Sequence, residues 1–306
     1  MLIVAQNINK SFGKHQALTN FSIEIPEQSI YGLLGPNGAG KTTFLRILNQ
    51  ISVPDSGEIL INNELLKKSD IQHIGYLPEE RGLYKSMKVG EQILYLAQLK
   101  GLSKTEAKKR MFEWFEKLKI EDWSQKKIQD LSKGMAQKIQ FIVTVIHQPK
   151  LLIFDEPFSG FDPVNAQIIK DQILALNRQG TTILFSTHRM ESVEELCNHM
   201  ALIHQSHKVL DGKVSEIKNS FKNNTFEVKL ETENSELVLS SLQPRFELHQ
   251  IKAFSNHLEF QMKAADNFSE NDILRELIQL GKVQAFAERI PSVNEIFIQK
   301  VAGYAS

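Results

Sequence analysis

Gly35-Pro36-Asn37-Gly38-Ala39-Gly40-Lys41-Thr42, followed by Thr43, is the stretch that decides the fold of this chain. It follows the pattern G-x-x-x-x-G-K-[ST], in which a glycine-rich loop turns its backbone N–H groups toward phosphate groups. The glycines matter because a backbone that turns inward onto an anion leaves little room for Cβ atoms. Lys41 is predicted to reach the β- and γ-phosphates, and the Thr42 hydroxyl to reach a magnesium ion. The loop therefore predicts a nucleotide site.

The segments on either side of this loop have the apolar spacing that the motif requires. Ile30, Leu33 and Leu34 predict a short strand before it, and residues 44–48 predict a helix after it. The N-terminus of that helix would add unpaired N–H groups and the positive end of its dipole to the same anion. The alternative is a glycine-rich turn with an unrelated lysine. The order of strand, loop and helix argues against it.

The composition is that of a soluble globular protein with one large or two ordinary domains. The chain has 306 residues, of which 42% are hydrophobic, and its 36 basic and 36 acidic side chains cancel. That balance argues against a protein that coats nucleic acid, and the run Lys108–Arg110 is expected to be a solvated helix face. The single Cys197 excludes an intrachain disulfide, and no apolar run approaches the roughly 18 residues of a membrane span. We expect a cytosolic protein that reaches a membrane only through a partner.

A second chemical signal lies at the end of an apolar run. Residues 151–154 predict a buried parallel strand that carries Asp155 and Glu156 at its C-terminal end, where ligands bind in open α/β sheets. Asp155 is predicted to hold the magnesium shell, and Glu156 to polarise an attacking water. An acidic pair alone is more often an ordinary strand end, but the phosphate loop upstream favours catalysis. A similar run over residues 181–187 ends at His188, which could touch a γ-phosphate or serve only as a structural hydrogen-bonding group.

The rest of the N-terminal part predicts strands and three helices. Short antiparallel strands at residues 2–4, 8 and 21–25 surround Phe12, which is expected on a loop, where it could stack on an adenine or make a core contact. Turns are expected at Pro54–Gly57 and Asp211–Gly212. The three helices are predicted over residues 89–101, 103–118 and 136–147.

The composition changes at residues 218–224, where Asn, Ser and Lys predict a linker. Beyond it, strands are predicted at residues 225–230, 237–239, 246–253, 258–262 and 283–286, with helices at 271–280 and 292–301. These elements predict a small α+β domain without a catalytic constellation.

Residues 1 to about 215 resemble the ATP-binding subunit of an ABC transporter, with the motifs of that family in order. The Walker A loop matches Gly35–Thr43, and the Walker B strand matches Leu151–Asp155, with Glu156 as the expected catalytic base. The D-loop matches Ser159–Asp162, and the switch histidine matches His188. Phe12 matches the position of the aromatic residue that stacks on adenine. The resemblance implies ATP and Mg²⁺ as cofactors. It also implies an α/β P-loop (RecA-like) core with antiparallel β and helical subdomains. We place this core at residues 1–218, with the helical subdomain at about 86–148 and an accessory α+β domain at 219–306.

Leu131–Met135 is similar to the LSGGQ signature of the same family. The resemblance implies that two copies pair head to tail, so that Ser132 and the Gly134 N–H close on the γ-phosphate held by the Walker A loop of the other subunit. Lys133 and Met135 replace the Gly and Gln of the signature. The serine and the backbone donor remain, so we expect closure to survive.

Two further positions depart from the family pattern. Glu79 stands where the family has its Q-loop glutamine, which touches Mg²⁺ and senses the membrane partner. A carboxylate can bind magnesium but adds negative charge beside the γ-phosphate, so the metal role is better supported than the sensing role. Phe161 replaces the usual leucine of the D-loop, which is a smaller change.

The segment Tyr76–Tyr84 and the extra C-terminal domain resemble a subgroup of ABC exporter ATPases typified by bacterial sodium efflux subunits. This resemblance implies a separate integral membrane permease, peripheral attachment to the cytoplasmic face through it, and export; whether sodium, another ion, a drug or a lipid is the cargo stays open. No nucleic acid partner is expected.

The competing classes are an ABC ATPase that acts on a ribosome or a chromosome, and a nucleotide-sensing adaptor. A single nucleotide domain without sustained heptads disfavours the first, and intact Lys41, Asp155, Glu156 and His188 disfavour the second.

Overall fold

The computed structural model describes residues 2–80, 82–265 and 267–302, so Arg81 of the segment Tyr76–Tyr84 lies outside the described residues. The chain divides into two compact units. One comprises the residues up to Val214 together with the chain from Phe297, and the other comprises Ser215–Ile296. Helix α7 (Val214–Ser220) begins at this division and occupies the first part of the predicted linker. The expected boundary between residues 218 and 219 stays a prediction.

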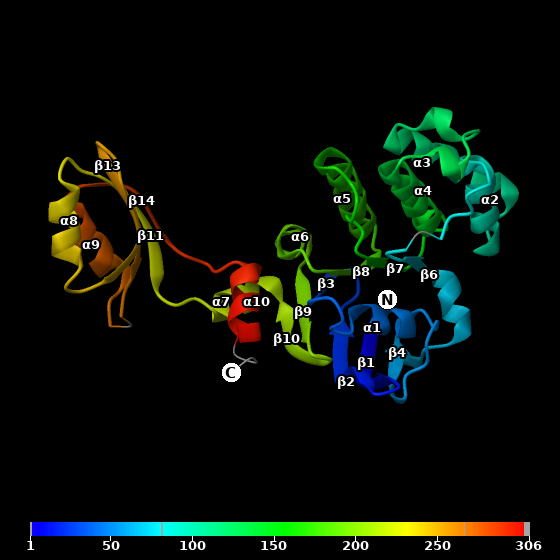
Figure 1. The fold of residues 1–306 in the computed structure, drawn as a ribbon, viewed down its shortest axis with the longest axis horizontal. Coiled ribbons are helices and arrows are strands. Elements are labelled where there is room, and N and C mark those ends of the chain that lie inside the picture. Colours follow the sequence, from blue (N-terminus) through cyan, green and yellow to red (C-terminus); the bar gives the residue numbers. More distant parts are fainter. Residues whose placement is uncertain (1, 81, 266, 303–306) are drawn as a thin grey trace. The chain divides into compact units, whose positions relative to one another are not determined.

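A six-stranded sheet forms the centre of the N-terminal unit, with the strand order β10-β9-β3-β8-β7-β6 (Figure 1). The strands are β3 (Ile30–Leu34), β6 (Ile74–Leu77), β7 (Leu151–Asp155), β8 (Thr182–Thr187), β9 (His199–His204) and β10 (His207–Lys213). All pairs are parallel except β9 with β10. Every residue of β3, β7 and β8 is buried, which is why their sequences are continuous apolar runs. The parallel arrangement brings the carboxyl ends of these three strands to one edge.

An antiparallel sheet packs against this centre through helix α1 (Lys41–Leu48). Its strands are β1 (Ile3–Phe12), β2 (His15–Ile25), β4 (Ser56–Ile61) and β5 (Glu64–Leu65). The prediction of several short strands was wrong, because register shifts on either side of Ile8 interrupt the alternation within one long β1. Phe12 is the last residue of β1 rather than a loop residue, and it pairs with His15 at the start of β2.

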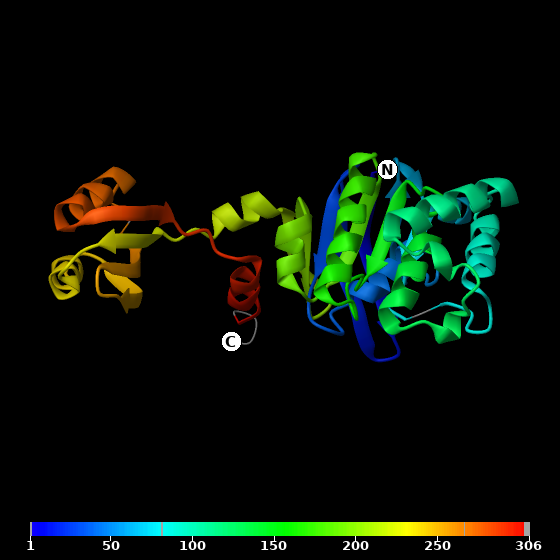
Figure 2. The ribbon, with the colours of Figure 1, turned by 90° about the horizontal axis from the view of Figure 1, so that it is seen from above.

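Helices α2 (Val89–Leu99), α3 (Lys104–Leu118) and α4 (Lys133–Val145) gather into one cluster (Figures 1 and 2). The short 3₁₀ turns η2 (Glu121–Trp123) and η3 (Ile128–Asp130) accompany them, whereas η1 (Lys68–His73) directly precedes β6. Helix α4 begins at Lys133 rather than at the predicted Ala136, because the Ser132 hydroxyl accepts a hydrogen bond from the Met135 N–H and caps the helix. Helices α5 (Pro163–Arg178) and α6 (Met190–Leu196) also belong to this unit.

Two predictions near the end of this unit and beyond it were wrong. Asp211–Gly212 is not a turn: β10 continues through both residues, which pair with Ala201 and Met200 of β9. The strand predicted at residues 237–239 is part of helix α8 (Ser235–Leu242). A short apolar run does not distinguish a strand from a helix. Here the Asn234 side chain caps the helix by accepting from the Leu237 N–H, a non-apolar signal that decides the local structure.

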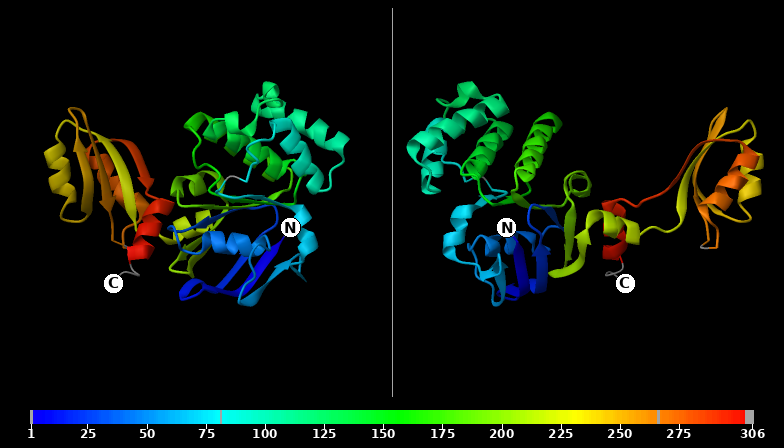
Figure 3. Two further views of the ribbon diagram at one scale, coloured as in Figure 1. Left: turned by 45° about the vertical axis from the view of Figure 1, so that its right-hand side comes forward. Right: turned by 180° about the vertical axis from the view of Figure 1, so that it is seen from behind.

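The C-terminal unit contains an antiparallel sheet of strand order β12-β13-β11-β14. Its elements are β11 (Thr225–Glu231), α8, β12 (Glu247–Ala253), β13 (His257–Lys263), α9 (Glu270–Leu280) and β14 (Lys282–Glu288). This is the β-α-β-β-α-β arrangement of ferredoxin-like domains. Helix α10 (Val293–Ala302) follows these elements, and its residues from Phe297 onward belong to the N-terminal unit. Helices α8 and α9 lie on one face of the sheet (Figure 3). Side chains from both helices and from β11 and β13 form one core, so the predicted α+β class is confirmed.

No helix within residues 2–80, 82–265 and 267–302 has the length and apolarity that crossing a membrane requires.

The first prediction concerns Phe141 of α4, which ties the helical cluster to the central sheet. Phe141 is 1% exposed, and its ring lies 5.7 Å from that of Trp114 on α3 and 5.9 Å from that of Phe154 on β7. Phe141→Ala should lower the free energy of unfolding by about 3–5 kcal/mol, because it removes a large buried ring and leaves a cavity. Denaturant titration followed by tryptophan fluorescence measures this. The control Phe112→Ala removes a half-exposed ring of α3 and should cost about 1 kcal/mol or less; equal losses would contradict the prediction.

Candidate nucleotide site

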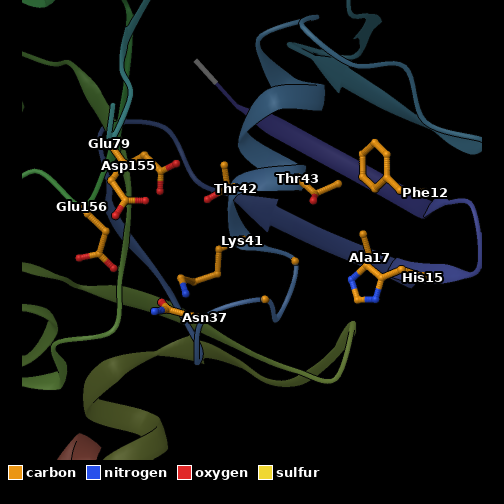
Figure 4. A pocket seen from close by; sticks show the side chains of 12 residues that line it. Phe12, His15, Ala17, Asn37, Lys41, Thr42, Thr43, Glu79, Asp155 and Glu156 are labelled. Atoms are coloured by element: carbon orange, nitrogen blue, oxygen red, sulfur yellow. The ribbon is translucent and has the colours of Figure 1, made fainter. Parts of the chain in front are cut away.

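A pocket of about 250 Å³ lies over the loop that follows β3. It is lined by Phe12, His15, Ala17, Asn37, Gly38, Gly40, Lys41, Thr42, Thr43, Glu79, Asp155 and Glu156. In Figure 4, Lys41 lies between the carboxylates at one end and the pair Phe12 and His15 at the other. The fold thus gathers in one pocket ten of the residues that the sequence predicted for the site, from β1, the loop, α1 and the ends of β6 and β7.

The backbone conformation of the loop requires glycine at Gly40. Its φ is 116°, in the region that side chains rarely adopt, and a Cβ at this position would overlap the Ala17 carbonyl oxygen. Gly40 also stands directly before α1, so the loop leads into the N-terminus of that helix. Unpaired N–H groups of the first turn and the helix dipole favour an anion there. The loop therefore has the backbone conformation and the position before a helix that a phosphate group requires.

Lys41 is a lysine with only 6% of its surface exposed. Its Nζ donates hydrogen bonds to the carbonyl oxygens of Gly35 at 2.7 Å and Pro36 at 3.0 Å. Burial lowers the pKa of Lys41, and the nearby carboxylates of Glu156, Asp155 and Glu79 act in the opposite direction by favouring the charged form. The loop thus holds an ammonium group in the pocket where anionic phosphates would lie.

The ends of β7 and β8 hold the two carboxylates through hydrogen bonds. Asp155 is 2% exposed and accepts from the Ser186 hydroxyl. Glu156 Oε1 accepts from the His188 backbone N–H at 2.9 Å and lies 2.7 Å from His188 Nδ1, and its Oε2 accepts from the Thr187 hydroxyl at 3.3 Å. The predicted His188 therefore contacts Glu156 directly. Glu156 also has a φ of 51°, so its backbone is strained in this position.

The donor set fits a magnesium ion held jointly with phosphates. Thr42, Asp155 and Glu79 supply one hydroxyl and two carboxylates to the same pocket. Within the described parts of the chain, no group of three or more His, Cys, Asp or Glu side chains is arranged to hold a metal ion. Magnesium usually takes one or two carboxylates and completes its shell with phosphate oxygens and waters, so this set suits magnesium bound with a nucleotide.

The sequence analysis missed four residues of the site region. His15 and Ala17 of β2 line the pocket beside Phe12, and only the pairing of β1 with β2 brings them there. Ser186 and Thr187 hold the carboxylates, and their place at the end of an apolar strand was the available signal.

Ser132 and Gly134 lie outside the pocket, at the start of α4. Ser132 is exposed. A Cβ built on Gly134 would meet nothing nearer than the Phe161 ring at 4.0 Å, so the packing of this chain does not require glycine there. The start of α4 therefore presents an open backbone surface.

Comparison with known proteins identifies the family. The chain is 43% identical over 302 residues to the uncharacterized ABC transporter ATP-binding protein YhaQ of Bacillus subtilis, covering 98% of both chains. The protein belongs to the ABC transporter ATP-binding proteins. Residues 18–159 match the ABC transporter family, and residues 212–301 match the C-terminal domain of DrrA1-3-like ATP-binding proteins. As a member, this ABC protein is an ATPase whose activity is coupled to transport, and it binds ATP.

Other relatives of this ABC protein carry functional names. The linearmycin resistance ATP-binding protein LnrL of Bacillus subtilis is 33% identical over 71% of this chain and 70% of its own. The Nod factor export ATP-binding protein I of Cupriavidus metallidurans is 33% identical over 72% and 73%. A solved structure of an ATP-binding subunit of an ABC transporter superposes with a TM-score of 0.67 at 26% identity, covering 72% of this chain and 93% of that chain. The α/β P-loop fold is thereby confirmed.

The second prediction concerns Gly40. Gly40→Ala should weaken ATP binding by at least about tenfold, because the added Cβ would push the loop away from Ala17 and disturb the backbone donors. Isothermal titration with ATP and Mg²⁺ measures the affinity. The matched control is Gly101→Ala, which introduces alanine at a φ of 90° with no atom within 4 Å of the new Cβ. If both variants bind ATP like the parent, the loop does not depend on this glycine.

Proposed function

We propose that this ABC protein hydrolyses ATP with Mg²⁺ in a head-to-tail homodimer and thereby drives export through a separate membrane permease. The observation that carries the proposal is the convergence of Lys41, Asp155 and Glu156 on one pocket over a phosphate-binding loop. A cation, a metal-binding carboxylate and a second carboxylate are the groups that phosphoryl transfer to water needs.

Glu156 is the general base or water-orienting carboxylate in this proposal. Its side chain is 10% exposed and is held by Thr187 and His188 at a fixed orientation. A carboxylate that is held in this way can accept a proton from a water molecule at a defined place. The His188 ring contacts Glu156 Oε1, the oxygen that also accepts from the His188 N–H, so this ring can orient the base. The same ring could reach a γ-phosphate next to Glu156.

Asp155, Thr42 and Glu79 are the magnesium-binding residues in this proposal. When bound, the ion would neutralise charge on the phosphates. Asp155 keeps one oxygen engaged with Ser186, which fixes the direction of the carboxylate. Phe12, a residue that is 54% exposed, would stack on the adenine at the far end of the pocket.

The dimer is supported by the open surface at the start of α4. Ser132 and Gly134 do not line the pocket of their own chain, yet the α4 N-terminus has unpaired N–H groups and no acidic residue in its first turn. A second subunit that places its nucleotide there would receive these donors. Each ATP site would then consist of residues from both chains.

Export is supported by the names of two relatives, one a resistance protein and the other a Nod factor exporter. The proposal therefore favours an antibiotic-like cargo, with sodium or another ion as the alternative. The C-terminal α+β domain, placed at residues 219–306, would act as an accessory element because the proposed phosphate, metal and base residues all precede it.

The third prediction tests the base. Glu156→Gln should retain ATP affinity while the hydrolysis rate falls by about two to four orders of magnitude, because the amide cannot accept the proton. With ATP bound and not hydrolysed, the dimer of this variant should accumulate, and size-exclusion chromatography with light scattering measures it. Glu113→Gln, on the exposed face of α3, is the control and should behave like the parent. Near-parental turnover in Glu156→Gln would remove Glu156 from this role.

The fourth prediction tests Glu79. Glu79→Ala should raise the Mg²⁺ concentration needed for half-maximal ATPase activity, because one of two carboxylates in the proposed shell is lost. Glu79→Gln should retain measurable activity. The control is Glu80→Ala, which removes a neighbouring carboxylate that does not line the pocket. A Mg²⁺ titration of Glu79→Ala that superposes on that of Glu80→Ala would exclude Glu79 from the shell.

A further inference from the structure

Strand β6 lies at the end of the strand order of the central sheet, so within the described chain only β7 pairs with it. Backbone carbonyl groups on the other edge of such a strand need donors from elsewhere in the chain. Carbonyls two residues apart in a strand point to the same edge, and those of Ile74 and Tyr76 have side-chain groups as their partners. The free edge of β6 is therefore covered by side chains.

Helix α4 provides these side chains from one of its faces. Gln140 and Thr144 of α4 and His147 just after it follow the spacing i, i+4 and i+7, which places them on one side of the helix. His147 Nε2 donates to the Ile74 carbonyl oxygen at 3.3 Å, and the Thr144 hydroxyl lies 3.5 Å from the Tyr76 carbonyl oxygen. Helix α4 thus follows the free edge of β6 in the opposite chain direction.

Gln140 extends this arrangement past the end of β6, to both sides of Glu79. Its side chain is buried, with 5% of the residue exposed. The Gln140 amide nitrogen donates to the carbonyl oxygens of Pro78 at 3.2 Å and Glu80 at 3.3 Å. A side-chain amide has two N–H donors, so one group can make both bonds. A single buried side chain therefore anchors the carbonyls before and after Glu79.

The position of Glu79 makes this anchor relevant to the nucleotide site. Glu79 is exposed and lies two residues beyond the end of β6 at Leu77, so the pairing of β6 with β7 does not fix it. The ring of Pro78 restricts the backbone on one side of it. Glu79 lines the nucleotide pocket, and it lines a second, small cavity of about 10 Å³ together with Gln140. Anchoring both flanking carbonyls limits the directions in which the Glu79 carboxylate can point.

We propose that Gln140 is a positioning residue for the Mg²⁺ shell, which directs the Glu79 carboxylate into the nucleotide pocket by holding the carbonyls of Pro78 and Glu80. This rests on the magnesium role that the proposed function gives to Glu79. Gln140 does not line the nucleotide pocket, so it acts through Glu79 and does not touch the nucleotide. Thr144 contacts the same strand edge farther from Glu79, so its contact serves only the packing of β6 on α4.

The first test compares Gln140→Met with Thr144→Val in the chain without nucleotide. Methionine keeps an unbranched side chain of similar length but has no N–H donor, and valine removes the Thr144 hydroxyl with little change of shape. NMR order parameters of the Glu79 and Glu80 backbone N–H groups report how freely this segment moves. These order parameters should fall in Gln140→Met and stay parental in the matched control Thr144→Val.

The second test measures ATP affinity by isothermal titration at increasing concentrations of free Mg²⁺. Gln140→Met should raise the Mg²⁺ concentration that gives half of the full gain in affinity by roughly two- to tenfold, the factor that one lost hydrogen bond typically represents. The affinity for ATP without Mg²⁺ should stay parental, because the phosphate loop is unchanged, and Thr144→Val should titrate like the parent. In the Glu79→Ala background, Gln140→Met should cause no further shift, because no carboxylate is left to direct.

Three outcomes would overturn the proposal. Parental order parameters in Gln140→Met would show that the amide does not hold the segment. A parental Mg²⁺ titration of Gln140→Met would show that the anchor has no effect on the ion, and a further shift in the Glu79→Ala background would show that Gln140 acts on another group. A parental Mg²⁺ titration of Glu79→Ala would refute the magnesium role of Glu79 and, with it, the purpose proposed for Gln140, whereas the order parameters would still decide whether Gln140 anchors the segment.

Discussion

A buried ammonium group needs oxygen acceptors around it, and this requirement organises the ATP site. Lys41 is almost fully covered, so its charge is stabilised by the carbonyl oxygens of Gly35 and Pro36 and by the field of the carboxylates across the pocket. Gly35, Gly38 and Gly40 take a positive φ, which lets the loop backbone curl around the lysine. Packing of α1 between the two sheets then holds the loop in place.

The order of strands in the central sheet decides which groups can meet that lysine. Strand β8 lies between β3 and β7, so the hydroxyls at its end are placed to hold the acids that follow β7. Register is equally important. Asp155 pairs with Ser186 in the parallel ladder of β7 and β8, and a slip of one residue would turn that hydroxyl to the other face.

The departures of this chain from its family pattern fall in two places. Glu79 lines the pocket and adds a third carboxylate near Lys41, which makes a divalent cation more important for charge balance. Lys133 and Phe161 lie at the contact between α4 and the D-loop, away from the phosphates. The first departure adds charge within the pocket, and the other two lie where α4 contacts the D-loop.

The sequence by itself determined the phosphate loop, the strand ending in Asp155 and Glu156, and the α/β class, because each depends on residues that are close together in the chain. A Gly-rich loop before a helix predicts a phosphate-binding loop, and an apolar run before two acids predicts a buried strand that ends in carboxylates. Only the tertiary structure decided which distant groups support these motifs. Strand order brings Thr187 and His188 to Glu156, and it brings His15 and Ala17 to the pocket. Helix placement brings Lys133 against Gly160. The errors have other causes. Bulges interrupt the alternation of apolar residues in β1, and the local Asn234 cap favours a helix at α8, where apolar spacing alone does not distinguish a helix from a strand.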